Sequence, residues 1–334
     1  MNIAVLGAGA WGTAMAIHLN RTGHRVTLCS RRFEHALELS SARENIDYLP
    51  GHTWGPDLQV GCEFKPATME AELVILACPM KGLRGFCEAL KAERESAREL
   101  KMVVTLCKGV EPETLLTPSA IVEELLPGVA VGALSGPSNA AEVAEGRPTA
   151  VVLASEADEA LTTEMQETFN GGALRVYRSG DLLGVELGGA LKNPYAIGAG
   201  LCDGLKLGDN AKAAYLTRSL HEMVRAGVAL GGQPETFYGL SGFGDLVATS
   251  TGAWSRNRTF GEALAKGTPI DELLGHRKTV VEGYAATEGF HALLKKHGAE
   301  TPILAHLYAI LYEGLQPRKA LESLLARAPK PEHH

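Results

Sequence analysis

The stretch NIAVLGAGAWGTAMAIHLNRTGHRVTLC, residues 2–29, decides the fold of the first half of this chain. The apolar run Asn2–Leu6 predicts a short buried strand, and the pattern Thr13–Arg21 predicts a helix. Gly23 interrupts the chain before a second strand-like run, Arg25–Cys29. A strand, a glycine-rich turn, a helix and a strand in this order form one βαβ unit, which predicts a parallel sheet.

The turn GAGAWG, residues 7–12, has the glycine spacing of a dinucleotide-binding loop. Gly7 permits the tight turn, Gly9 allows the backbone to approach a pyrophosphate, and Gly12 allows the helix to pack closely on the strand. The positive N-terminus of the following helix would face the phosphates. Because the motif lies in its proper βαβ context, we predict a bound dinucleotide rather than a turn in which glycines serve packing alone.

The end of the second predicted strand should carry the residue that reads the adenosine ribose, and NAD sites usually place a carboxylate there. This chain has Ser30, Arg31 and Arg32 instead. Two guanidinium groups can form bidentate contacts to a 2′-phosphate. We therefore expect NADPH to be preferred, or at least accepted beside NADH. The alternative is that both arginines form a solvated loop face with weak selectivity.

Strand-like and helical patterns alternate through the first half and then give way to helices alone. The later strand-like runs are Leu73–Ala77, Met102–Leu106, Val129–Leu134, Thr149–Leu153 and Leu174–Val176. We expect an α/β, Rossmann-type, mostly parallel sheet that is covered on both faces. After Ser179 the patterns are helical. We therefore place a dinucleotide-binding domain at residues 1–179 and an all-α substrate and catalytic domain at residues 180–328.

Composition narrows the class of function. The 334 residues suit two domains, and 45% hydrophobic with 21% charged residues is typical of a globular enzyme. A net charge of −7 gives no overall attraction to nucleic acid, so we expect none as a partner, and an anionic substrate must be attracted by local cations. No apolar run is long enough for a membrane span, and the six cysteines contain no CxxC pair. We expect a cytoplasmic protein without a bound metal.

The segment Leu182–Gly200 is an apolar helical stretch with five glycines and three strongly polar residues, Glu186, Lys192 and Asn193. Each glycine inside a helix costs about 0.5–1 kcal/mol relative to alanine, so close approach of another backbone or of a ligand must compensate. Burial of Lys192 would lower the pKa of its ammonium group toward the range useful for proton transfer. We predict a general acid here; the alternative is a lysine that snorkels to solvent or pairs with Glu186.

A second polar segment could bind an anion. Ser255 is a suitable N-cap for the helix that follows, but Arg256 in its first turn opposes the helix dipole unless an anion is bound. Free backbone N–H groups, Arg256 and Asn257 could therefore hold a phosphate, although a basic surface turn would have the same sequence. Asp245, between glycines in an expected loop, could bind a substrate hydroxyl and orient Lys192.

A third group of polar residues follows predicted strands. Lys108 and the segment SGPSN, residues 135–139, each come after a strand, and ligands of open α/β sheets bind at the C-terminal ends of the strands. Lys108 could attract an anionic substrate and lower the pKa of a neighbouring Lys192. Ser138 could contact the substrate or could simply cap the helix that begins near Asn139.

Read together, these motifs closely resemble the NAD(P)-dependent glycerol-3-phosphate dehydrogenases of the bacterial type. The match extends to about Tyr312 and includes GAGAWGTA at 7–14, NIDYLPG at 45–51, CKGVE at 107–111, LSGPSNAAEVA at 134–144, GVELGGALKNPYAIGAGLCDGLKLGDNAKAA at 184–214, GLSGFGDLVATST at 239–251, SRNRTFG at 255–261 and VVEGYAAT at 280–287. The resemblance implies reduction of dihydroxyacetone phosphate to sn-glycerol 3-phosphate for phospholipid biosynthesis, by a homodimer. The chain departs from the family's common residues at Ala10, where Ser is usual, and at Ser250, where Cys is usual.

The resemblance also implies roles by position, and Lys192 becomes the proton donor and acceptor. The implied substrate contacts are Lys108, Gly136, Ser138, Asp245, Ser255, Arg256 and Asn257. The implied cofactor contacts are Ala10, Trp11, Arg31, Arg32, Tyr48, Lys108, Ala140, Arg256, Val280 and Glu282. In this reading hydride moves from C4 of the nicotinamide to the ketone carbon, and Lys192 protonates the developing alkoxide, held by Asp245 and Lys108.

Two other functions fit parts of the sequence. A dehydrogenase of the same architecture could act on a carboxylate, because an arginine cradle alone does not distinguish a carboxylate from a phosphate. The SRN and GGALKN segments favour the phosphate. A non-catalytic dinucleotide sensor is the other alternative, but a sensor has no need of a costly buried ammonium such as that of Lys192.

Overall fold

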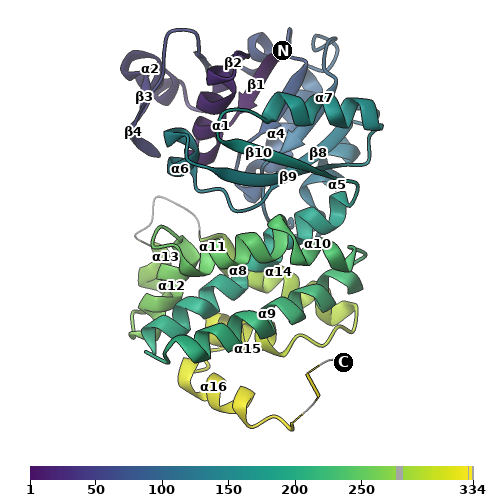
Figure 1. The fold of residues 1–334 in the computed structure, drawn as a ribbon. Helices are drawn as coiled ribbons and strands as arrows, with labels where there is room; N and C mark the ends of the chain where they lie inside the picture. The colour runs from purple at the N-terminus through teal and green to yellow at the C-terminus, as the bar shows by residue number, and fades with distance from the viewer. Residues whose placement is uncertain (276–280, 330, 333–334) are drawn as a thin grey trace.

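The computed structural model describes residues 1–275, 281–329 and 331–332, and it has a sheet-containing N-terminal half and a helical C-terminal half (Figure 1). The N-terminal half contains an eight-stranded sheet in the order β10-β9-β8-β7-β6-β1-β2-β5. The C-terminal half begins with the long helix α8, Leu182–Gly204. The expected fold class, a Rossmann-type sheet followed by helices, is therefore confirmed.

The strands of the main sheet are parallel except at one junction. They are β1 Asn2–Leu6, β2 Arg25–Cys29, β5 Gln59–Gly61, β6 Leu73–Leu76, β7 Met102–Thr105, β8 Ala130–Ser135, β9 Thr149–Ser155 and β10 Leu174–Ser179. Pairing is parallel from β5 through β8, and β9 then runs antiparallel to β8. Every predicted strand overlaps an observed one.

Three short strands were missed by the sequence patterns. They are β5 at the sheet edge and the separate hairpin of β3, Glu44–Asn45, with β4, Leu49–Thr53. Pro50 and Gly51 argue against a strand at β4, and two or three residues carry no readable alternation. This hairpin belongs to the NIDYLPG segment.

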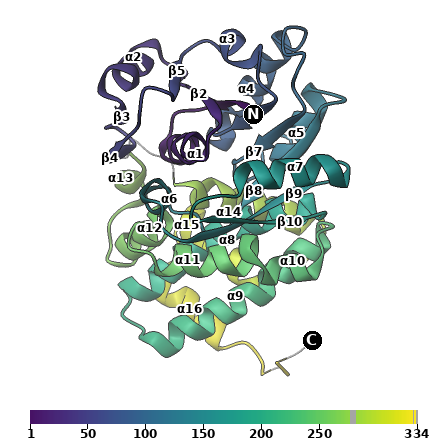
Figure 2. The same cartoon turned by 45° about the horizontal axis from the view of Figure 1, so that its top comes forward.

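Helices cover both faces of the sheet, which is why its strands consist of continuous apolar runs. One face packs against α1 Ala10–Arg21, α6 Ala140–Glu145 and α7 Glu159–Phe169. The other packs against α3 Phe64–Thr68, α4 Met80–Ala92 and α5 Pro118–Leu125, while α2, Phe33–Ala42, follows β2. Helices α1 and α6 lie side by side over the first face (Figure 2).

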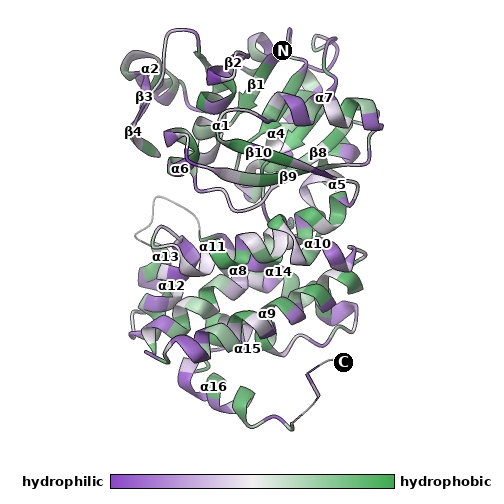
Figure 3. Ribbon diagram, viewed as in Figure 1, coloured by the Kyte–Doolittle hydropathy of each residue, from purple (hydrophilic) through white to green (hydrophobic). Residues whose placement is uncertain are grey.

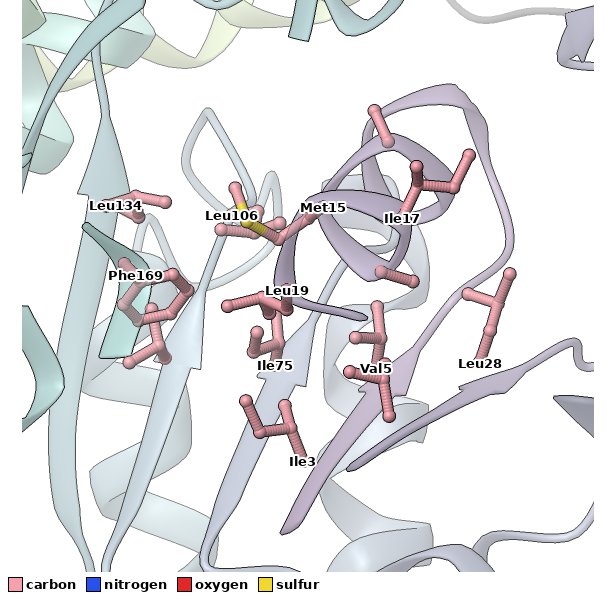
Figure 4. Packing of buried hydrophobic residues seen from close by; sticks show 14 of the residues in the cluster. Ile3, Val5, Met15, Ile17, Leu19, Leu28, Ile75, Leu106, Leu134 and Phe169 are labelled. Carbon is pink, nitrogen blue, oxygen red and sulfur yellow. The ribbon is translucent and has the colours of Figure 1, made fainter. Parts of the chain in front are cut away.

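Alternation along β1 supplies residues to two cores. Val5 faces the core under α1, where it packs with Met15 and Leu19 (Figure 4). Ala4 and Leu6 point to the opposite face and belong to the second core. Burial of each large apolar side chain contributes about 1.5–3 kcal/mol, so these two cores hold the glycine-rich turn at the end of β1 in place.

The helical half is built around α8. Its other helices are α9 Asp209–Ala229, α10 Pro234–Tyr238, α11 Asp245–Thr251, α12 Arg256–Ala265, α13 Ile270–Gly275, α14 Glu282–Lys296, α15 Pro302–Tyr312 and α16 Pro317–Leu325. Central sheet strands are hydrophobic, whereas α2 and α16 carry many hydrophilic residues (Figure 3). Within the described ranges, none of the helices is both long and apolar enough to cross a membrane.

The glycines of α8 allow helix backbones to touch. A Cβ atom at Gly200 would lie 1.9 Å from the carbonyl oxygen of Arg258 in α12. In the opposite direction, a Cβ at Gly261 would lie 1.9 Å from the carbonyl oxygen of Ile197. The expectation that close backbone approach compensates for glycine in this helix is confirmed at Gly200.

Candidate active site

The glycine-rich turn joins β1 to α1 at the C-terminal edge of the sheet. Gly7 has a φ of 120°, and a Cβ there would lie 2.3 Å from the carbonyl oxygen of Ala77. A Cβ at Gly12 would lie 2.1 Å from the carbonyl oxygen of Gly7. Gly9 differs, because no described atom lies within 4 Å of its Cβ position. Protein packing does not require glycine there, whereas a pyrophosphate at the N-terminus of α1 would.

The residues expected to read the adenosine end lie just beyond β2. Arg31 and Arg32 are both exposed, and Arg32 lies 3.9 Å from the carboxylate of Asp47. An exposed ion pair of this kind contributes little to stability, so it leaves Arg32 able to bind another anion. Tyr48 packs edge-on against the ring of His35, with 5.5 Å between the centroids.

A buried hydrogen-bond network joins this region to the glycine-rich turn. The Asn45 side chain donates to the carbonyl oxygen of Ala8 at 3.0 Å and to the Thr13 hydroxyl at 2.7 Å. His35 bridges the Ser30 hydroxyl, at 2.9 Å, and the Asn45 side-chain oxygen, at 3.3 Å. The β3–β4 hairpin is thereby held beside the proposed dinucleotide site, and residues 7–14 fit such a ligand.

The two candidate lysines share one buried carboxylate. The Nζ atom of Lys192 on α8 lies 3.0 Å from Oδ1 of Asp245, and Nζ of Lys108 contacts Oδ2 of the same residue. Asp245 is 2% exposed and Lys192 is 6% exposed. Lys192 also donates to the Thr249 hydroxyl at 2.6 Å, and that hydroxyl donates to Asp245 at 3.1 Å. Residues 108, 192 and 245 were predicted to be near one another, and the structure brings them into contact.

Burial and charge act in opposite directions at this cluster. Burial lowers the pKa of Lys192 to about 8, although Asp245 raises it and Lys108 lowers it further. Burial alone would raise the pKa of Asp245, but the ammonium groups of Lys108 and Lys192 outweigh it and hold that pKa below its usual value. The carboxylate is therefore ionised at neutral pH. A lysine that can lose its proton near pH 8 is suited to general acid and base chemistry.

The segment expected to bind phosphate begins helix α12. Ser255 is its N-cap, and the hydroxyl accepts from the backbone N–H of Arg258 at 3.2 Å, as predicted for a cap. Arg256 is exposed in the first turn, and Asn257 is buried. Asn257 donates to the side-chain oxygen of Asn193 at 2.9 Å and accepts from the backbone N–H of Gly283 at 3.0 Å.

The segment after β8 lies on the sheet side of the same region. Gly136 has a φ of 138°, and its carbonyl oxygen accepts from Lys108 at 3.4 Å and from the Ser138 hydroxyl at 3.0 Å. Asn139, not Ser138, is the N-cap of α6, where its side chain accepts from the N–H of Glu142. The interpretation of Ser138 as a cap is wrong, because the amide oxygen of Asn139 occupies the capping position.

Two further interpretations need correction. Asp245 does not lie in a loop: it begins α11 directly after a π-helical turn, Leu240–Gly244, whose backbone packs against Gly188 of α8. Glu186 is not the partner of Lys192, because its carboxylate accepts from Ser119.

The other implied cofactor contacts among the described residues lie at the N-terminal ends of three helices. Ala10 and Trp11 start α1, Ala140 starts α6, and Glu282 starts α14. Val280 lies outside the described residues.

Sequence reasoning missed two members of this site. Thr249 was only part of a polar stretch, yet its hydroxyl bridges Lys192 and Asp245. Its spacing of four residues from Asp245 on α11 is the available signal, since such residues share a helix face. Asn193 was noted as polar but given no role, and it contacts Asn257 and, at 3.5 Å, Glu282.

Comparison with known proteins agrees with this arrangement. Family models described as the N-terminus and C-terminus of NAD-dependent glycerol-3-phosphate dehydrogenase match residues 2–161 and 181–322. The chain belongs to this family. Glycerol-3-phosphate dehydrogenase [NAD(P)+] of Thiobacillus denitrificans is 46% identical over 333 residues, covering 99% of this chain and 100% of the relative. The enzyme of the same name from Ralstonia nicotianae is 45% identical, covering 99% of each.

Solved structures agree with the family's fold. The crystal structure of glycerol-3-phosphate dehydrogenase from Coxiella burnetii has a TM-score of 0.91 at 38% identity, covering 97% of this chain and 98% of that chain. D-mandelate dehydrogenase in complex with NADH has a TM-score of 0.59 at 16% identity, covering 94% and 98%. The second likeness shows a shared fold alone, so it does not favour a carboxylate substrate for this member of the dehydrogenase family.

Proposed function

We propose that this chain reduces dihydroxyacetone phosphate to sn-glycerol 3-phosphate with NADPH or NADH, and so supplies phospholipid biosynthesis. Residues 1–179 would hold the dinucleotide, and residues 180–328 would supply the proton and most of the substrate contacts. The observation that carries this proposal is the buried carboxylate of Asp245 shared by Lys108 and Lys192. Reduction of a carbonyl group needs a proton donor, and the lysines of this cluster can transfer a proton inside a buried site.

Lys192 acts as the general acid in the reduction. The reduced nicotinamide, when bound, supplies the hydride that the carbonyl carbon accepts. Lys192 gives its proton to the carbonyl oxygen as negative charge develops there, and the ammonium of Lys108 stabilises that charge. Asp245 holds both lysines in place and keeps Lys192 protonated, while Thr249 fixes the direction of its Nζ atom. In the reverse direction Lys192 takes the hydroxyl proton as general base.

The start of α12 is proposed to bind the substrate phosphate. Ser255 caps this helix, and Arg256 and Asn257 lie in its first turn, where backbone N–H groups and the helix dipole favour an anion. Gly136 and Ser138 approach from the end of β8 and complete the substrate contacts. Their position next to Lys108 supports this assignment.

The cofactor is proposed to lie along the β1–α1 turn. Its contacts would be Gly7, Gly9, Ala10, Trp11, Gly12, Arg31, Arg32, Tyr48, Lys108, Ala140, Arg256, Val280 and Glu282. If Arg31 and Arg32 bind a 2′-phosphate, replacing both with alanine lowers kcat/KM for NADPH by about 10- to 100-fold and leaves that for NADH nearly unchanged. An equal loss with both cofactors would contradict this role.

The decisive experiment follows NADPH oxidation with dihydroxyacetone phosphate in wild type and Lys192→Ala. We expect kcat to fall by about 10²- to 10⁴-fold while NADPH still binds. Lys212→Ala is the matched control, because Lys212 pairs with Asp203 elsewhere in the helical half. Turnover of a 3-hydroxy acid but not of glycerol 3-phosphate would favour a carboxylate substrate. A folded wild type that binds NADPH without any turnover would favour the sensor.

We also propose a cytoplasmic homodimer formed through the helical half. We place Val228 and Tyr238 at this interface, since they are exposed by 44% and 54% and lie on helices α9 and α10, which pack together. Light scattering on the purified protein should give twice the 35.4 kDa chain mass. A monomer at assay concentration would contradict the proposal.

A further inference from the structure

One buried carboxylate of α8 has no part in the chemistry proposed above. Glu186 is 5% exposed, and it is six residues before Lys192 on the same helix. Its Oε1 accepts from the backbone N–H of Ser119 at 2.8 Å, and its Oε2 accepts from the Ser119 hydroxyl at 2.5 Å. Ser119 lies in the first turn of α5, which belongs to the sheet-containing half. The contact therefore joins the two halves of the molecule.

The partner of Glu186 ends the connection that begins at Lys108. Residues 108–119 run from just after β7 into the first turn of α5. Val110 and Leu115 pack against the helical half, whereas Leu116 packs on the sheet-containing half and Glu111 pairs with Arg84 of α4. Val110 is buried in the core of the helical half. Leu115, a non-glycine residue, has a φ of 62°, a conformation that persists only when surrounding contacts impose it. Hydrogen bonds inside the connection close this turn, from the N–H of Leu115 to the carbonyl oxygen of Glu111 at 2.7 Å and from the N–H of Glu111 to that of Leu116 at 2.9 Å.

This connection is fixed to the helical half at both ends. At one end the ammonium of Lys108 contacts Asp245, and at the other Ser119 donates twice to Glu186. Glu186 and Lys192 are about 9 Å apart along α8, at 1.5 Å per residue. One rigid helix therefore carries both the proposed proton donor and the anchor for the loop that carries the second lysine.

The carboxylate at this position satisfies two buried donors of α5 and is held against its own desolvation. Burial raises the pKa of Glu186 to about 7, against the lowering effect of its bonds with Ser119, so the site opposes ionisation. An apolar contact between the two halves is formed by the same helix, where Leu182 and Val185 of α8 pack on Ala133, Val152 and Ala154 of the sheet. An apolar residue at 186 would extend that contact and avoid the desolvation of a carboxylate, but it would leave the N–H and hydroxyl of Ser119 without acceptors.

We propose that Glu186 is a positioning residue for the reduction: it anchors the Lys108–Ser119 connection to α8 and thereby sets the distance between Lys108 and Lys192. The inference rests on the proposed roles of the two lysines. Displacement of a catalytic group by about 1 Å can cost about 100-fold in rate, so loss of this anchor should reach the active site without changing any residue there.

The test compares Glu186→Leu, which removes both acceptors, with Glu186→Gln, which keeps an oxygen for the N–H and offers its amide to the hydroxyl. We expect Glu186→Leu to raise KM for dihydroxyacetone phosphate and lower kcat/KM by about 10- to 100-fold, with the Kd of NADPH unchanged. Glu186→Gln should restore kcat/KM to within about threefold of wild type. If Glu186→Leu does not fold, Ser119→Ala removes one of the two bonds and should shift KM in the same direction.

Glu222 provides the matched control. It is 1% exposed and accepts from the N–H groups of Ile303 and Leu304 at the start of α15 and from the hydroxyl of Tyr195 on α8, entirely within the helical half. Glu222→Leu should lower Tm and leave KM unchanged. A Glu186→Leu enzyme with reduced Tm but wild-type KM would overturn the inference. The proposed function would still stand in that case if Lys192→Ala were inactive. Failure of the proposed function would instead be seen as a wild type without turnover.

Discussion

Replacing Asp245 with asparagine should move the pH at which the reduction rate falls. The Nζ atom of Lys192 lies 3.0 Å from Oδ1, and two unit charges at this distance attract by about 1.4 kcal/mol in water and about 5.5 kcal/mol at an effective dielectric constant of 20. These energies correspond to a pKa change of roughly 1 to 4. Burial already lowers the pKa of Lys192 to about 8 with the carboxylate present. Without it, and with Lys108 still close, that pKa should fall to about 7 or below.

The assay is kcat/KM for dihydroxyacetone phosphate as a function of pH, which reports groups of the free enzyme. Reduction requires protonated Lys192, so the rate is highest below its pKa and is lost as the pH rises through it. Wild type should lose rate above a pH of about 8. Asp245→Asn should lose rate at least one pH unit lower.

Two features of the experiment isolate the carboxylate. The second ionisation of the substrate phosphate, near pH 6, affects both enzymes equally. Asp158→Asn is the control, because it makes the same charge change at the N-cap of α7, where asparagine caps as well as aspartate. The reasoning is refuted if the upper pH limit of Asp245→Asn coincides with that of wild type.

Three further substitutions each test the surroundings of one buried position. Thr249→Val keeps the shape but leaves one donor of Lys192 without its acceptor, so kcat should fall by about tenfold at unchanged Kd for NADPH in steady-state and binding assays. Gly200→Ala gains about 1 kcal/mol of helix propensity but places a Cβ 1.9 Å from the backbone oxygen of Arg258, so thermal unfolding should show a net loss of about 1–3 kcal/mol. Ser250→Cys should gain about 1 kcal/mol in denaturant unfolding, because the buried hydroxyl lacks a hydrogen-bond partner among the described residues, and a loss of stability would count against this explanation.

The sequence by itself determined the features that depend on local pattern. The βαβ unit at residues 2–29 follows from apolar runs and glycine spacing, and each predicted strand of the sheet was found. Lys192 could be singled out because a charged side chain is costly to bury, so a lone cation in an apolar helical stretch indicates a function. The Ser255 cap could also be predicted, because an N-cap accepts from a backbone N–H only three residues further along the chain.

Only the tertiary structure decided which polar groups meet. Lys108 and Asp245 are 137 residues apart, and Glu186 and Ser119 are 67 apart, so no local pattern records either contact. The glycines before Asp245 suggested a loop, but Gly188 of α8 leaves room for that backbone to pack as a helical turn. Periodicity reports which face of an element is buried, whereas the packing of α8 between the sheet and the other helices selects the partner that each buried polar group finds.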